Sequence, residues 1–367
     1  MQSQSSTGIN WGIIGVGDVT EVKSGPAFSR VSDSSLSCVM RRDLEKVKDY
    51  ALRHNVDSFY TDAQEMLDSG KANAVYIATP PHVHTSYAKQ CIESGIDKVY
   101  IEKPLALTSQ EAKDLQSFVQ TYGRTHNRDI RVVVAHYRRS LEYFKEISSM
   151  FPLIGNIRSV SLKTLQSPKK NILVNTEDNW RVNSAISGGG YFHDLSPHQL
   201  DIMIHWFGKV KSSSGCSATQ GDGACDDIVV GNILFENGVV FSGTWCFTVH
   251  ESDIKDECII YGDKGHIRFG FFGETKITVD TIEKANVMII EPPEHIQQPM
   301  ITHMVEYFLD KREDNPCSLE EAVTVMEIID SFITPESERV QYTYGSSDKQ
   351  TKSNAREEHQ ENKRMKL

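Results

Sequence analysis

Short apolar runs alternate with helix-like stretches over roughly the first 135 residues. The apolar runs predict strands over Ile9–Ile14, Leu36–Met40, Asn73–Thr79, Lys98–Ile101 and Ile130–Ala135. Between them, the spacing of apolar positions predicts helices over Asp43–His54, Thr61–Ser69, His84–Ser94 and Ser109–Tyr122. Strands that alternate with helices in this way are typical of a parallel sheet. We therefore expect an α/β fold with a doubly wound parallel sheet over residues 8–137.

The pattern changes beyond Arg139. A predicted helix over Leu141–Met150 is followed by longer strand-like runs that hairpin-type turns separate. These runs are Arg158–Leu165, Ile228–Phe235, Val239–Thr248, Glu257–Tyr261, His266–Phe271, Lys276–Val279 and Val287–Ile290, and two amphipathic helices follow near residues 299–310 and 318–333. We expect an α+β domain with a large, mostly antiparallel open sheet over residues 138–340. Residues 345–367 are polar without periodicity, which is typical of a disordered tail.

Composition narrows the possible partners. The 367 residues carry a formal net charge of -11, which argues against a general nucleic-acid binder. The sequence contains no apolar run of the ~18 residues that a membrane span needs, and its N-terminus lacks the pattern of a signal peptide. Seven scattered cysteines favour reduced thiols in a cytoplasmic protein. We expect a small-molecule partner, with neither nucleic acid nor membrane involved.

A glycine pair follows the first predicted strand. Gly15 permits a tight turn, and Gly17 lets the backbone approach a pyrophosphate at the start of the next helix, with Asp18 and Val19 in its first turn. Thr20 stands where a third small residue is usual, so the fingerprint is incomplete. An ordinary turn is the alternative, and the position at the first strand-to-helix turn favours a dinucleotide site.

Two arginines follow the second predicted strand, where an acidic residue usually accepts the ribose hydroxyls of NAD. The guanidinium groups of Arg41 and Arg42 suit a 2′-phosphate, whereas a carboxylate would repel one. A solvated surface pair is the alternative. The sequence favours NADP(H), with NAD(H) also possible.

Two further clusters carry candidate chemistry. Glu102-Lys103-Pro104 ends the fourth predicted strand, where ligands bind in open α/β sheets. Farther along, Asp194, His198 and Asp201 follow three glycines with i, i+4 and i+7 spacing, so a helix would place them on one face. A histidine flanked by carboxylates is typical of proton transfer. A capped helix that packs into a core is the alternative for this cluster.

These residues together resemble the glucose–fructose oxidoreductase/inositol dehydrogenase/MocA family over roughly residues 8–340. The resemblance rests on the glycine loop, the Thr79-Pro80-Pro81-His82-Val83-His84 stretch, the Glu-Lys-Pro tripeptide and the Gly-Gly-Gly…Asp…His…Asp run. It implies a Rossmann domain, a second domain on a large open sheet, and NAD(P)-dependent oxidation or reduction of a sugar or polyol. Two residues depart from the family pattern. Thr20 stands in the glycine fingerprint, and Arg41 stands where NAD-preferring relatives carry an acid.

The resemblance also assigns roles to individual residues. Lys103 matches the active-site lysine, Asp194 and His198 match the acid and the histidine, and Asp201 matches the acid one turn later. At the cofactor site it implies Thr79, Pro80, His84, Glu102 and Lys103. By analogy with relatives, we expect a homodimer or homotetramer that associates through the exposed face of the large sheet.

These assignments lead to a mechanistic hypothesis. Lys103 and His198 hold a carbohydrate hydroxyl or carbonyl, Asp194 orients His198, and Arg181 donates hydrogen bonds to substrate hydroxyls. Hydride transfer requires no metal, so we expect none. Two alternatives stay open from the sequence, namely a glycosidase that uses tightly held nicotinamide transiently and a non-catalytic NADP(H) sensor.

Overall fold

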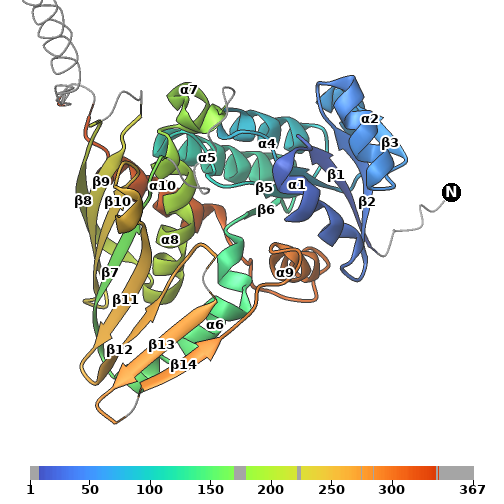
Figure 1. Cartoon of the computed structure of the whole chain (residues 1–367). Coiled ribbons are helices and arrows are strands. Elements are labelled where there is room, and N and C mark those ends of the chain that lie inside the picture. The colour runs from blue at the N-terminus through green and yellow to red at the C-terminus, as the bar shows by residue number, and fades with distance from the viewer. Residues whose placement is uncertain are drawn as a thin grey trace, which may run out of the picture.

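The computed structural model describes residues 8–168, 179–220, 225–273, 275–283, 285–335 and 338. The predicted tail over residues 345–367 lies outside this part of the chain. The first half folds around a parallel sheet in the order β3-β2-β1-β4-β5-β6 (Figure 1). Its strands are β1 (Ile9–Ile14), β2 (Ser34–Met40), β3 (Ser58–Tyr60), β4 (Ala74–Ile77), β5 (Lys98–Ile101) and β6 (Arg131–Val134). The helices of this half are α1 (Asp18–Val22), α2 (Leu44–Arg53), α3 (Ala63–Asp68), α4 (His84–Glu93) and α5 (Ser109–His126).

The strands of this sheet are almost continuously apolar because both faces are covered. All four residues of β4 are buried, and the side chains of Trp11, Ile13 and Ile14 in β1 are fully buried. The predicted cap of α5 is confirmed, since the Thr108 hydroxyl accepts a hydrogen bond from the Glu111 amide at 3.2 Å. The strand order is that of a Rossmann fold, so the predicted doubly wound sheet is confirmed.

The second half is built on an eight-stranded sheet in the order β14-β13-β12-β11-β7-β10-β9-β8. Only the β7–β10 pair is parallel among its described neighbours, which confirms the expected mostly antiparallel sheet. Its strands are β7 (Ile157–Leu165), β8 (Val210–Ala218), β9 (Ile228–Phe235), β10 (Val240–Cys246), β11 (Lys255–Gly262), β12 (Gly265–Phe269), β13 (Lys276–Thr281) and β14 (Ala285–Ile289). The helices are α6 (Glu142–Ser149), α7 (Ser184–Ser187), α8 (Tyr191–Phe207), α9 (Gln298–Phe308) and α10 (Leu319–Phe332).

Helices cover one face of this sheet, as Figure 1 shows for α8 and α10. Side chains alternate along β10 accordingly: Phe241 and Trp245 are buried under the helices, whereas Val240 and Ser242 are exposed on the other face. The sequence pattern missed two edge strands. Three-residue β3 is too short to show a period, and β8 is a serine-rich strand without an apolar alternation.

The two halves are joined through α9 and the segment before it. The ring centroids of Trp11 in β1 and Phe308 in α9 lie 5.9 Å apart. The Tyr100 hydroxyl donates to the Gln297 side chain at 2.9 Å, and the Gln297 amide donates to the carbonyl of Lys23 at 3.0 Å. These contacts hold α9 and the segment before it against β1, β5 and the end of α1. Within the described residues, no helix has the length and apolar character that crossing a membrane requires.

Candidate active site

The glycine turn lies where the strand order reverses, between β1 and β4. Gly15 has φ of +94°, and a Cβ there would lie 2.6 Å from Cγ2 of Thr79 at the end of β4. Any larger residue would therefore force the two strand ends apart. The Thr79 hydroxyl is buried and has no hydrogen-bond partner in the described part of the chain, so it is a polar group for a ligand to satisfy.

Thr20 closes the glycine turn. Its hydroxyl accepts a hydrogen bond from the Gly17 amide at 2.9 Å and donates one to the Gly17 carbonyl at 2.8 Å. The departure from the usual third small residue therefore has a structural reason. Arg41 also reaches this loop, because its Nη1 donates to the carbonyl of Val16 at 2.9 Å, whereas Arg42 is exposed.

Lys103 and Asp194 meet at the carboxyl edge of the parallel sheet. Lys103 Nζ donates to the carbonyl of Asp194 at 2.8 Å and to its Oδ1 at 2.7 Å. Arg181 Nε donates to Oδ2 at 3.0 Å. Burial raises the pKa of Asp194, but the two cations outweigh it and lower the pKa to about 2. The carboxylate is thus ionised at neutral pH and ties β5 to α8.

His198 lies one turn further along α8 in an apolar setting. Its ring centroid is 5.3 Å from that of Tyr137 and 6.0 Å from that of Phe272, and its buried Nδ1 has no hydrogen-bond partner among the described residues. Burial, followed by the charges of Lys103 and Arg138, lowers the pKa of His198 well below its usual range. The imidazole is therefore neutral at pH 7.

The expectation that two carboxylates flank His198 is wrong. Asp201 instead binds Arg139, which donates from Nη2 to Oδ1 at 2.5 Å and from Nε to Oδ2 at 3.1 Å. Both oxygens of Asp194 are taken by Lys103 and Arg181, so this carboxylate does not orient the imidazole. Residues on one face of a helix still point in somewhat different directions. Each carboxylate therefore binds the cation that packs against its own position, and neither binds His198.

Buried polar contacts fix the strand ends around Lys103. Glu102 Oε1 accepts hydrogen bonds from the Tyr76 hydroxyl at 2.5 Å and from Gln297 Nε2 at 2.7 Å, while its Oε2 accepts from the Lys103 amide at 3.1 Å. The ring nitrogens of His84 lie 2.7 Å from the carbonyl oxygen of Thr79 and 2.9 Å from that of Pro104. Glu102 and His84 therefore position the backbone beside Lys103.

Comparison with known proteins decides the family. Residues 9–127 match the oxidoreductase family with an NAD-binding Rossmann fold, and residues 153–343 match the C-terminal alpha/beta domain of the same family. The chain belongs to the Gfo/Idh/MocA oxidoreductase family. This confirms the resemblance that the sequence motifs indicated.

Individual relatives agree with this membership. The chain is 46% identical over 326 residues to "Oxidoreductase P35" of Formosa agariphila, a match that covers 88% of this chain and 98% of that protein. It is 29% identical over 150 residues to "scyllo-inositol 2-dehydrogenase (NADP(+)) IolU" of Bacillus subtilis, covering 41% of this chain and 43% of that protein. A levoglucosan dehydrogenase crystallised with NADH and levoglucosan has the same fold, with a TM-score of 0.70 at 22% identity over 89% of this chain and 96% of that one.

The sequence motifs did not single out several residues that surround the site of this Gfo/Idh/MocA protein. Tyr137 and Arg138 follow β6, Phe272 follows β12, and Lys23 follows α1. The charges of Arg138 and Lys23 both act on His198. Little in the sequence indicated these residues. Arg138 and Arg139 are adjacent, for example, and a sequence does not show which of the two faces the site.

The buried histidines of this Gfo/Idh/MocA site make stability depend on pH. Burial lowers the pKa of both His136 and His198 from 6.5, so in the folded state both stay neutral where the unfolded chain binds protons. The contribution of these two histidines to the free energy of unfolding is therefore fully present above pH 6.5. It is lost as the pH drops below 6.5, by at most about 1.4 kcal/mol per pH unit for each histidine. Denaturant unfolding at pH 7.5, 6.5 and 5.5 measures this slope. His136→Gln should make the slope shallower, and an unchanged slope would contradict the assignment.

Proposed function

We propose that this protein is an NADP(H)-dependent oxidoreductase that transfers hydride between nicotinamide and a CH–OH group of a sugar, polyol or related carbonyl compound. The observation that supports this most directly is the contact of Lys103 with Asp194. It joins the end of β5 to α8 across 91 positions of the chain. It also sets an ammonium group near a neutral imidazole at the strand ends, where ligands of open α/β sheets bind.

The residues at the glycine turn fit a dinucleotide. Gly15 and Gly17 leave room for a pyrophosphate, the start of α1 with Asp18 and Val19 presents backbone amides, and Arg41 borders the loop. Next to this turn, the buried Thr79 hydroxyl is without a partner, and Pro80 continues the strand end. A nicotinamide cofactor bound here supplies or takes up the hydride.

The protein's own side chains handle the proton and the charge. In the oxidation direction, neutral His198 accepts the proton of the reacting hydroxyl. The Lys103 ammonium stabilises the negative charge that grows on the substrate oxygen, and Asp194 holds the ammonium in place. Arg181 is available beside Asp194 to donate further hydrogen bonds to substrate hydroxyls. In the reduction direction the protonated imidazole returns the proton.

Arg41 carries the preference for NADP(H) in this proposal, with exposed Arg42 as a weaker second donor. A charge-assisted hydrogen bond to a phosphate contributes about 1.5–3 kcal/mol. Arg41→Ala should therefore raise KM for NADPH by about 10- to 100-fold and change KM for NADH much less. Initial rates with each cofactor measure this difference, and equal effects on both would remove the NADP assignment.

A spectrophotometric screen tests the reaction itself. The absorbance of NADPH and NADH is followed separately against sugars, ketoses, inositols and dicarbonyls, and at least one compound should be turned over. Release of phenol from aryl glycosides without added cofactor, and no redox turnover in the screen, would instead favour the glycosidase alternative. Binding of NADPH without either activity would favour a sensor.

Two features of the structure concern the cellular compartment and the oligomeric state of the protein. None of the seven cysteines forms a disulfide in the described part of the chain, which supports a reducing compartment such as the cytoplasm. The open face of the large sheet presents exposed side chains such as Val240 and Tyr261, which supports association with a second copy. Light scattering after gel filtration measures that oligomeric state.

A further inference from the structure

Cations are in excess around His198. Its surroundings contain Lys103, Arg138 and Lys23, and Arg181 lies nearby on Asp194. The single carboxylate of Asp194 is shared by Lys103 and Arg181, while no described carboxylate forms an ion pair with Arg138 or Lys23. The chain as a whole has a net charge of -11. A local surplus of positive charge on an acidic protein attracts an anionic ligand to that part of the fold.

Arg138 is the most unusual of these cations because it is buried and forms no ion pair with any carboxylate of the described residues. Only 8% of its surface is exposed. Its Nη1 donates to the carbonyl of Phe271 at 2.6 Å, and its buried Nε has no partner among the residues that the structure describes. The guanidinium carbon lies 4.8 Å from the ring centroid of Phe272, the aromatic residue that also contacts His198. Burying such a charge is costly unless a ligand oxygen compensates it.

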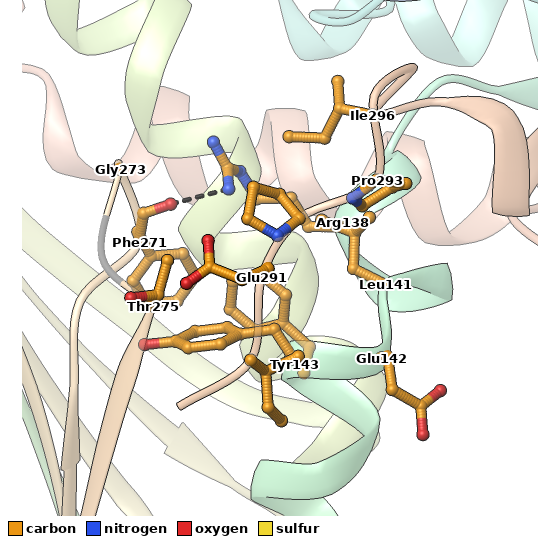
Figure 2. A pocket seen from close by; sticks show the side chains of 13 residues that line it. Arg138, Leu141, Glu142, Tyr143, Phe271, Gly273, Thr275, Glu291, Pro293 and Ile296 are labelled. Atoms are coloured by element: carbon orange, nitrogen blue, oxygen red, sulfur yellow. Dashed lines mark hydrogen bonds between the residues drawn. The ribbon is translucent and has the colours of Figure 1, made fainter. Parts of the chain in front are cut away.

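A pocket adjoins this guanidinium. Its volume of about 140 Å³ is close to that of a cavity that accepts one six-membered ring, on the order of 150 Å³. Figure 2 shows Arg138 among mainly apolar side chains that line it, including Leu141, Tyr143 and Ile296. The two carboxylates on its border, Glu142 and Glu291, belong to exposed residues, and neither forms an ion pair with Arg138.

We propose that this pocket is a subsite for an acidic sugar ring, with Arg138 binding the carboxylate of a uronic acid substrate or of a neighbouring uronic acid unit. Aromatic and aliphatic walls suit the C–H faces of a pyranose. Nη2 of Arg138 makes no hydrogen bond to the described residues and its buried Nε makes none either, so the guanidinium still has donors for a carboxylate. This assignment rests on the proposed oxidoreductase function and narrows its substrate class.

Matched sugar pairs test the proposal. kcat/KM is measured for D-glucuronate against D-glucose, D-galacturonate against D-galactose, and D-mannuronate against D-mannose, with glucose 6-sulfate and galactose 6-sulfate as a second class of anion. At least one acid should exceed its neutral partner by about 30-fold or more. In Arg138→Met the ratio of kcat/KM for the acid to kcat/KM for its neutral partner should fall to about one, because any effect of the lost charge on His198 is common to both sugars. Arg138→Lys should recover only part of it, since an ammonium lacks the two-donor fork.

Binding measurements separate this proposal from the proposed function. Calorimetric titration of each uronate into the NADPH-loaded protein should show binding that Arg138→Met removes, even where turnover is absent. Arg158→Met is the matched control, because Arg158 is an exposed arginine on β7 paired with Asp263, and it should behave as the parent. Turnover of neutral sugars with no advantage for their acids would overturn the subsite and leave the oxidoreductase function standing. A preference for the sulfates alone, or no uronate binding, would also overturn it.

Discussion

Lys103→Met is expected to lower kcat by about 10²- to 10³-fold while the affinity for cofactor stays within a few-fold of the parent. Methionine keeps the length and packing of the lysine stem but removes the ammonium that stabilises charge on the substrate oxygen. Losing one preorganised donor of this kind costs about 10²–10³ in rate. The ammonium also holds Asp194 at 2.7 Å, so its loss disturbs the arrangement of α8 against β5 as well. Steady-state kinetics and cofactor fluorescence titration measure the two effects.

Stability must be separated from catalysis in this variant. Asp194 keeps its contact with Arg181, so the carboxylate is not left without a cation. Lys103→Arg preserves the charge next to Asp194 and should fold as the parent does, yet remain strongly impaired because the guanidinium cannot occupy the same point. Near-normal turnover by Lys103→Met would show that the ammonium does not act on the reacting oxygen.

His198→Asn is expected to reduce kcat by at least about 100-fold, since positioned proton transfer contributes about 10²–10⁴-fold. The side chain is nearly fully buried and neutral, and its Nδ1 makes no hydrogen bond. Its substitution therefore breaks no existing contact of that nitrogen, and cofactor binding should be kept. Single-turnover kinetics with NADPH isolates the chemical step from product release.

His205→Asn provides the control on the same helix, because His205 is an exposed residue at the end of α8. It should keep parent-like turnover. If His198→Asn retained turnover as well, the proton would have to be transferred by another group, and the role of the imidazole would be wrong. A loss of thermal stability equal in both variants would point to a helix defect rather than to chemistry.

Local patterns predicted most of the fold. The apolar runs identified β1, β2, β4, β5 and β6, because a strand covered on both faces must be apolar along its length. The glycine turn was also predictable, since the turn needs a positive φ at Gly15 and glycine is the residue that adopts it readily. The short edge strand β3 and the serine-rich β8 carried no such signal and were missed.

The sequence by itself therefore predicted the parallel α/β sheet and the open, mostly antiparallel second sheet, and it singled out Lys103 and His198 as candidates, whereas the strand order came from the structure. Only the tertiary structure decided which charges meet. Arg138 and Arg139 are adjacent in the chain, but Arg139 binds Asp201 while Arg138 turns to Phe271 and the pocket. The physical reason is that helix and strand periods fix the face on which a side chain lies, whereas the partner of a buried charge is set by segments that are distant in the chain.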